Sequence, residues 1–161
     1  MKSPMISLLF LLTSFYLIIT TILFFAQSYF IFFPREIAGY QHSFLKQFKS
    51  NEIALDHDGI SLHGWFIQNE TNPDNPLIIY YGGNAEEVSM NLYDLDKFGD
   101  HSLLFMNYRG YGKSEGRPGQ DALFSDALFI FDHISKNHHI PPEKIILMGR
   151  SLGSAVAIHV A

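Results

Sequence analysis

The segment Ile145-Ile146-Leu147-Met148-Gly149-Arg150-Ser151-Leu152-Gly153-Ser154-Ala155-Val156-Ala157 decides how the chain folds. Its apolar first part is typical of a buried strand, and the small residues after Ser151 are typical of the first turns of a helix. The pattern G-x-S-x-G lies between these two parts. It predicts a nucleophile elbow, a sharp strand-to-helix turn with a serine at its tip. A plain strand–helix turn is the competing interpretation.

The two glycines of this motif, Gly149 and Gly153, carry no side chain. The strand and the helix can therefore approach each other closely on both sides of a strained serine. Ser151 would then present its hydroxyl at a helix N-terminus, where backbone N–H groups and the helix dipole favour a developing negative charge. The motif makes Ser151 the candidate catalytic nucleophile.

Composition excludes several classes of function. A formal net charge of −5 over 161 residues disfavours binding to phosphate backbones, so nucleic acid is not an expected partner. The absence of cysteine excludes disulfides, thiolate metal sites and a lipid-modified cysteine. No metal is expected, because His133 and the pair His138-His139 lack further ligands at metal-binding spacing. His57 and His63 are interpreted as ordinary strand surface.

Residues 1–34 are predicted to form a transmembrane anchor. No charged side chain occurs from Ser3 to Pro34, and the apolar stretch from Met5 to Phe33 is longer than the roughly 20 residues that span a bilayer as a helix. A cleaved signal peptide is the alternative, but its apolar core would be shorter and the sequence has no convincing small-x-small cleavage site. We therefore expect a single-pass membrane protein, with the membrane as its partner through this helix.

Residues 35–50 are predicted to be a membrane-proximal connector. Lys2 precedes the apolar stretch, whereas Arg35, Lys46 and Lys49 follow it. This imbalance leans towards a cytoplasmic domain but leaves the side of the membrane open.

Residues 51–161 are predicted to begin with a β-hairpin. Residues 52–56 and 60–67 alternate between apolar and polar side chains, and Asp58-Gly59 between them is a strong two-residue turn.

Apolar strands alternate with helices in the rest of the domain. Asn84 is a plausible N-cap for a helix that Gly99 ends, and an amphipathic helix is predicted over residues 120–134. The alternation argues for an α/β fold with a parallel sheet and helices on both faces, preceded by the antiparallel start. The three apolar strands are expected at residues 77–81, 103–107 and 145–149.

A glycine-rich loop over residues 107–118 partly matches two nucleotide-binding motifs. For a P-loop, Asn107 stands where the first glycine belongs. For a dinucleotide fingerprint, Gly110 and Gly112 fit, but Glu115 occupies the last glycine position. Nucleotide binding is therefore the weakest of the functions considered, and no cofactor is expected.

Taken together, four segments resemble the α/β-hydrolase superfamily, and the resemblance covers Asn51 to the last residue. The chain is similar in particular to membrane-anchored bud-emergence-type serine hydrolases, which are related to serine aminopeptidase-like and lysophospholipase-like members. The segments are Asp58-Gly59 through Gly64-Trp65, Tyr81-Gly82-Gly83-Asn84-Ala85-Glu86, Asn107-Tyr108-Arg109-Gly110-Tyr111-Gly112-Lys113-Ser114 and Gly149-Arg150-Ser151-Leu152-Gly153.

The resemblance implies roles for particular residues. Ser151 would be the nucleophile, and the backbone N–H groups of Leu152 and Asn84 would stabilise the oxyanion. Relatives commonly carry H-G-N where this chain has Gly82-Gly83-Asn84, so any side-chain role of that histidine is lost. The implied substrate is a small acyl ester or amide, and the implied reaction needs no metal or cofactor.

The catalytic triad of this fold runs serine, acid, histidine along the chain. Residues 152–161 contain His159 but no Asp or Glu, and His159 is expected to point away from Ser151 within the last helix. We therefore expect the N-terminal half of a hydrolase sheet, truncated after the elbow and with little turnover of its own. A catalytically inactive membrane-anchored remnant or interaction module is the alternative. Chain order also excludes the residues Asp100, His101, Asp121 and Asp126.

Overall fold

The computed structural model describes residues 3–161, which divide into two compact units with the boundary between Phe33 and Pro34. The first unit contains the helix α1 (Pro4–Ile31), which begins after Ser3 as its N-cap. Its most apolar window has a mean hydropathy of 2.4. Within residues 3–161, α1 is the one helix that is long and apolar enough to cross a membrane.

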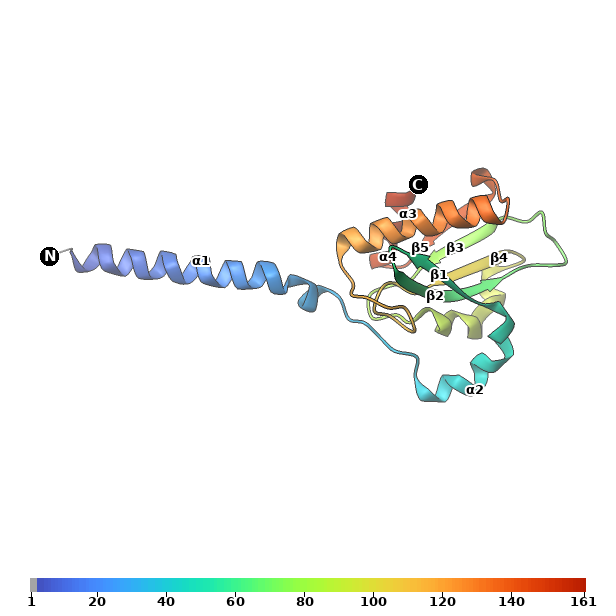
Figure 1. Cartoon of the computed structure of the whole chain (residues 1–161), viewed down its shortest axis with the longest axis horizontal. Helices are drawn as coiled ribbons and strands as arrows, with labels where there is room; N and C mark the ends of the chain where they lie inside the picture. The colour runs from blue at the N-terminus through green and yellow to red at the C-terminus, as the bar shows by residue number, and fades with distance from the viewer. Residues whose placement is uncertain (1–2) are drawn as a thin grey trace. The chain divides into compact units, whose positions relative to one another are not determined.

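The second unit is built on a five-stranded sheet with the strand order β1-β2-β4-β3-β5 (Figure 1). β1 is antiparallel to β2 and β2 to β4, whereas β3 runs parallel to both β4 and β5. This topology confirms the predicted antiparallel start and the parallel strands that follow it. The strands are β1 (Glu52–His57), β2 (Ile60–Ile67), β3 (Leu77–Tyr81), β4 (Ser102–Met106) and β5 (Ile145–Gly149).

The turn between β1 and β2 confirms the predicted hairpin. Asp58 and Gly59 have φ angles of 55° and 74°, and positive φ at both central residues is what a type I′ turn requires. The Gly59 amide also donates a hydrogen bond to the Asp56 carboxylate, at 3.2 Å.

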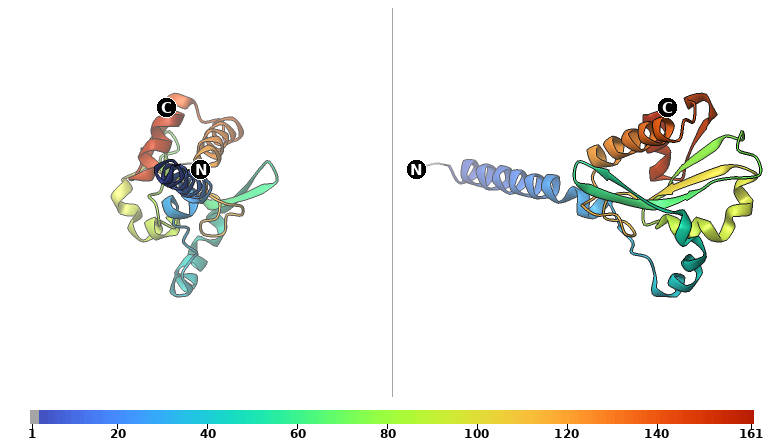
Figure 2. Two further views of the ribbon diagram at one scale, coloured as in Figure 1. Left: turned by 90° about the vertical axis from the view of Figure 1, so that its left-hand side faces the viewer. Right: turned by 45° about the vertical axis from the view of Figure 1, so that its right-hand side comes forward.

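Helices cover both faces of the sheet (Figure 2). One face carries α3 (Gln120–Asn137) and α4 (Leu152–Val160), which pack against each other. The opposite face carries the 3₁₀ helix η3 (Val88–Phe98). The remaining helical segments are η1 (Gly39–Gln41), α2 (His42–Leu45), η2 (Lys46–Asn51) and η4 (Pro142–Lys144).

The helix after β3 differs from the prediction at its N-terminus. Asn84 does not cap it, because its side-chain oxygen accepts from the Ala85 amide and Ala85 itself has a φ of 58°. Glu87 is the N-cap instead, and its carboxylate accepts from the Ser89 amide at 3.1 Å. Gly99, with a φ of 67°, ends the helix as predicted.

Both faces of β3 are buried, which explains its uninterrupted apolar run. Ile78 and Tyr80 belong to the core on the η3 side together with Trp65, and the predicted connector contributes the buried Leu45 to that core. Tyr81 faces the other way, since its hydroxyl donates to a carbonyl of α3, that of Ala127.

α4 lies very close to β3 and β5, and two glycines permit this approach. A Cβ atom on Gly153 would overlap the carbonyl oxygen of Tyr81, and one on Gly149 would overlap the carbonyl oxygen of Gly153. The Ser154 hydroxyl donates to the Gly149 carbonyl at 3.0 Å, across the same contact.

His63 in β2 is buried, so its interpretation as strand surface was wrong. Its side chain packs edge-on against Trp65, with ring centroids 4.8 Å apart. Within residues 3–161 neither ring nitrogen has a hydrogen-bond partner. Burial, and then the positive charge of Lys113, lower the pKa of His63, so folding favours the neutral form of this ring.

We expect Gly153→Ala to lower the free energy of unfolding by about 3 kcal/mol, because the added methyl must displace the backbone of β3 or α4. Denaturant unfolding of the full chain in neutral detergent measures this, with the fluorescence of Trp65, the single tryptophan, as the signal. Gly119→Ala is the matched control, since a Cβ there meets nothing within 4 Å. Equal stability of the two variants would contradict the packing argument.

We expect the free energy of unfolding to decrease as the pH falls below about 6.5, the ordinary pKa of histidine. In that range the unfolded chain binds a proton at residue 63 that the folded chain resists, so protonation favours unfolding. His63→Phe keeps the ring contact and should reduce this pH dependence, while His138, whose pKa is also lowered by burial, retains part of it. His159→Phe, at an exposed position, should leave it unchanged. Parallel pH profiles for wild type and His63→Phe would show that another group is responsible.

Candidate active site

The candidate site lies at one edge of the sheet, because the carboxyl ends of the parallel strands β3, β4 and β5 meet there. The Arg150 amide, just after β5, donates to the carbonyl of Tyr81 at the end of β3, at 3.1 Å. A Cβ atom on Gly83 would lie 3.4 Å from the Arg150 carbonyl oxygen. The turn after β3 and the turn after β5 are therefore direct neighbours.

Ser151 occupies the bend between β5 and α4. Its φ is 52° and its ψ is −114°, a left-handed conformation that residues with a side chain rarely adopt. The residue is exposed, and among the hydrogen bonds of the described residues none involves its hydroxyl. The hydroxyl thus lies at the surface at the carboxyl end of β5.

The N-terminus of α4 begins immediately after this serine. Leu152 is the first helical residue, so its N–H has no carbonyl partner within the helix. The next two amides are already used in the turn, from Gly153 to the Arg150 carbonyl and from Ser154 to the Ser151 carbonyl, both at 2.9 Å. The helix dipole adds positive potential at this end.

Two tyrosines from the loop after β4 hold the turn that contains Asn84. The Tyr108 hydroxyl donates to the Gly82 carbonyl and the Tyr111 hydroxyl donates to the Asn84 side-chain oxygen, each at 2.9 Å. Burial raises the pKa of Tyr108, which keeps its hydroxyl protonated as a donor. No local sequence pattern indicates either hydrogen bond. The only pointer is that Tyr108 and Tyr111 follow β4, which is parallel to and beside β3.

Glu86 joins this turn to the residue before Ser151. Its carboxylate accepts from the Gly83 amide at 2.7 Å and from the Tyr80 hydroxyl at 2.9 Å, and it pairs with Arg150 at 3.3 Å. The Arg150 side chain is 72% exposed, so the two hydrogen bonds contribute more to stability than the ion pair does. An N-cap at Asn84 would put Glu86 in the first turn of a helix, so the sequence did not indicate this role.

No histidine or carboxylate among the described residues forms a hydrogen bond with Ser151. His159 is exposed, and its ring stacks on Phe124 of α3 with centroids 4.1 Å apart. Asp100 accepts hydrogen bonds from the side chains of a polar loop that includes Asn75. Both side chains are thus in contact with residues other than Ser151.

Asp126, also excluded, lies in a cluster of its own. Arg109 donates to its carboxylate through Nε and Nη2, both at 2.7 Å, and the Nδ1 atom of His57 lies 2.7 Å from it. The His57 ring stacks on Phe129, with centroids 4.3 Å apart. The interpretation of His57 as ordinary strand surface was therefore wrong, because it links β1 to α3.

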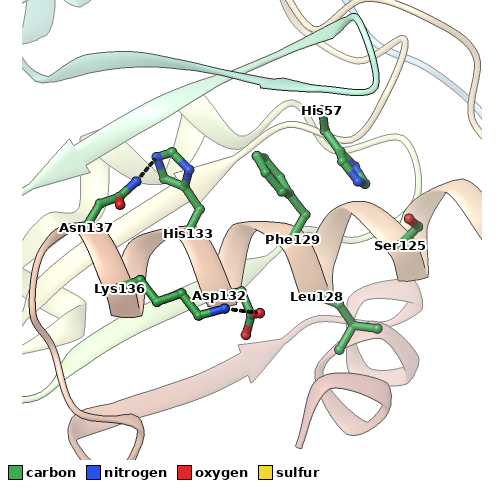
Figure 3. Close-up of a pocket in the computed structure, with 8 residues that line it drawn as sticks. All are labelled: His57, Ser125, Leu128, Phe129, Asp132, His133, Lys136 and Asn137. Atoms are coloured by element: carbon green, nitrogen blue, oxygen red, sulfur yellow. Dashed lines mark hydrogen bonds and ion pairs between the residues drawn. The ribbon is translucent and has the colours of Figure 1, made fainter.

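A groove of about 630 Å³ lies along α3 beside His57 (Figure 3). Polar groups in it pair with one another, Lys136 with Asp132 and Asn137 with His133. None of the candidate catalytic residues lines this groove, so it is separate from the turn at Ser151.

The glycine-rich loop after β4 does not form a phosphate cradle. The Gly110 amide donates to the Glu115 carbonyl at 3.0 Å, and the Gly112 amide donates to the Arg35 carbonyl at 2.7 Å. N–H groups bound in this way do not point at a ligand, as those of a P-loop do. Residues 3–161 also contain no group of three or more potential metal-ligating side chains.

Comparison with known proteins places the chain among longer relatives, although no family model matches it. The α/β hydrolase domain-containing protein WAV2 of Arabidopsis thaliana is 36% identical over 103 residues, which cover 62% of this chain and 33% of that protein. YfhR of Salmonella typhi is 37% identical over 101 residues, which cover 60% of this chain and 35% of YfhR. A membrane protein of Saccharomyces cerevisiae is 34% identical over 110 residues, which cover 66% of this chain and 38% of the yeast protein. The chain thus spans about a third of the length of each of these relatives.

Solved structures show the same fold. An α/β hydrolase of Vibrio vulnificus aligns with a TM-score of 0.67 at 23% identity, covering 79% of this chain and 46% of that one. An esterase of Pyrococcus furiosus aligns with a TM-score of 0.56 at 25% identity, covering 78% and 48%. The chain is therefore a homologue of α/β-hydrolase domain proteins and has the α/β-hydrolase fold.

Proposed function

We propose that Ser151 is the nucleophile of an acyl-transfer reaction on an ester or amide. The observation that carries this proposal is the backbone of Ser151, held at a φ of 52° and exposed between β5 and α4. Strained conformations of this kind concentrate at functional sites. The fold is shared with an esterase of known structure, which supports the same class of reaction.

The proposed reaction uses backbone N–H groups on two sides of the serine. The Ser151 hydroxyl gives its proton to a base and its oxygen attacks the acyl carbon, while the carbonyl electron pair moves onto the carbonyl oxygen; the base later returns the proton to the leaving alcohol or amine. The N–H groups of Leu152 and Asn84 would stabilise that oxyanion. Collapse of the intermediate expels the alcohol or amine, and water then releases the acyl group from the serine.

A serine hydroxyl needs an adjacent base, and none of the described residues supplies one to Ser151. In this fold the acid and the histidine follow the serine in chain order, and the relatives extend well beyond the matched region. We propose that the working enzyme takes its acid and histidine from residues other than these 161. These residues alone should then hydrolyse esters poorly.

We further propose that α1 anchors the hydrolase unit in a membrane as a single span. Its length and apolar composition support this, as does the yeast relative that is named as a membrane protein.

We expect the full chain in neutral detergent to react slowly with a fluorophosphonate probe, and imidazole added as an external base to speed this reaction. Ser151→Ala should abolish the imidazole-dependent labelling, as measured by mass spectrometry of the modified peptide. Ser154→Ala, in the same helix, is the matched control and should keep it. Rapid labelling and ester turnover without imidazole would contradict the assignment of the base to other residues. Labelling that survives Ser151→Ala would contradict the nucleophile.

We expect Glu86→Ala to slow the imidazole-supported labelling severalfold, because the Gly83 amide and the Tyr80 hydroxyl lose their common acceptor. The free energy of unfolding should fall by about 2 kcal/mol, the value typical of hydrogen bonds to a charged group. Glu143→Ala, at an exposed position, should change neither quantity. An unchanged labelling rate in Glu86→Ala would show that this carboxylate does not position the turn.

A further inference from the structure

A basic pocket lies on the second unit, away from Ser151. It has a volume of about 260 Å³ and is lined by Lys46, Lys49 and Lys113, together with His42 and Glu52. Part of its floor is apolar, because the buried Leu45 also lines it. The loop after β4, the start of β1 and the segment that follows α1 in the chain all contribute residues to it.

The charges in the basic pocket do not balance. The Glu52 carboxylate accepts from Lys49 at 2.9 Å and from Lys113 at 3.0 Å. Burial raises the pKa of Glu52, but these hydrogen bonds outweigh burial and bring the pKa down to about 2, so the group is ionised. Lys46 forms no ion pair with any of residues 3–161. Three ammonium groups therefore face one carboxylate, which leaves an excess of two positive charges.

A buried histidine lies next to the carboxylate of the basic pocket. His63 lies behind Glu52, with its Nε2 atom 3.7 Å from the carboxylate, yet its pKa is lowered. Burial is the main cause of the lowered pKa; the charges of Lys113 and Lys49 lower it further, whereas the Glu52 carboxylate raises it. A dianion such as a phosphate monoester would neutralise the excess.

Chain position indicates where such an anion comes from. Lys46 and Lys49 fall within the roughly 15–20 residues after an apolar span in which basic side chains act on the membrane surface. Basic clusters directly after a span are attracted to anionic lipids. The apolar floor at Leu45 suits the glycerol end of a headgroup better than it suits free phosphate.

We propose that the basic pocket binds the phosphate group of an anionic lipid headgroup in the membrane that holds α1. This rests on the proposed membrane span but not on acyl transfer at Ser151. Lys46 is the cation that meets the phosphate without losing an existing partner, whereas Lys49 and Lys113 share it with Glu52.

The test uses the full chain in neutral detergent and short-chain phosphatidic acid, with binding measured by native mass spectrometry. Phosphatidic acid should bind more tightly than phosphatidylcholine of the same chain length. Lys46→Gln should weaken that binding about fivefold. The matched control Lys97→Gln removes the same charge outside the pocket, where the lysine pairs with Asp94, and should leave binding unchanged.

Other outcomes would overturn the proposal. These are equal affinity for the two lipids, or equal effects of Lys46→Gln and Lys97→Gln. Glycerol phosphate or inorganic phosphate binding as tightly as phosphatidic acid would assign the pocket to a soluble anion instead. Lys113→Gln is a second variant, and Trp65 fluorescence reports whether each variant is folded. Retention of the chain in pure phosphatidylcholine vesicles after alkaline extraction tests the membrane span separately, so failure of the span and failure of the pocket are distinguishable.

Discussion

The close approach of α4 to the ends of β3 and β5 is the constraint on which the rest of the second unit depends. No Cβ atom fits at Gly149 or Gly153, so the backbones themselves are in contact. This approach forces the chain to bend within two residues, and Ser151 takes the left-handed conformation at a cost of about 1–3 kcal/mol. Burial of Val156 and Ala157 on the inner side of α4 offsets that cost.

Parallel strands then determine what surrounds the serine. Because β3, β4 and β5 run in the same direction, the turns that follow them meet at one edge. Asn84 arrives there from β3, and the loop after β4 brings Tyr108 and Tyr111 behind it. The site is thus an assembly of three strand ends, and none of the three segments makes it alone.

Patterns within short stretches of sequence predicted most of the fold. The Asp58-Gly59 turn reflects local backbone geometry, and the apolar runs of β3 and β4 reflect burial, both of which a single chain segment reveals. Alternation correctly indicated that β2 is a strand, but β2 is buried without interruption from Leu62 to Phe66, and the apolar β5, predicted to be buried, exposes Ile146 and Met148. The G-x-S-x-G motif likewise predicted the bend at Ser151, because only glycine fits at positions 149 and 153, where a Cβ atom would overlap backbone atoms.

Features that depend on distant partners were not predictable in this way. Asn84 looks like a helix cap until Tyr111 is seen to bind its side chain, and Glu86 looks like a first-turn acid until Gly83 is seen to donate to it. His57 looks exposed until Asp126, far along the chain, is seen beside it. A hydrogen bond between two residues that lie far apart in the chain leaves no periodic pattern in the sequence.

The hydrogen bonds from Tyr108 and Tyr111 have a consequence for protein engineering. The conformation of residues 82–84 therefore depends on side chains of a different loop, the one after β4. Transplanting the three-residue turn into another protein of this fold would transfer its residues without its conformation. A successful chimera would have to exchange both loops together, and random mutagenesis confined to the turn would leave its two tyrosine partners unchanged.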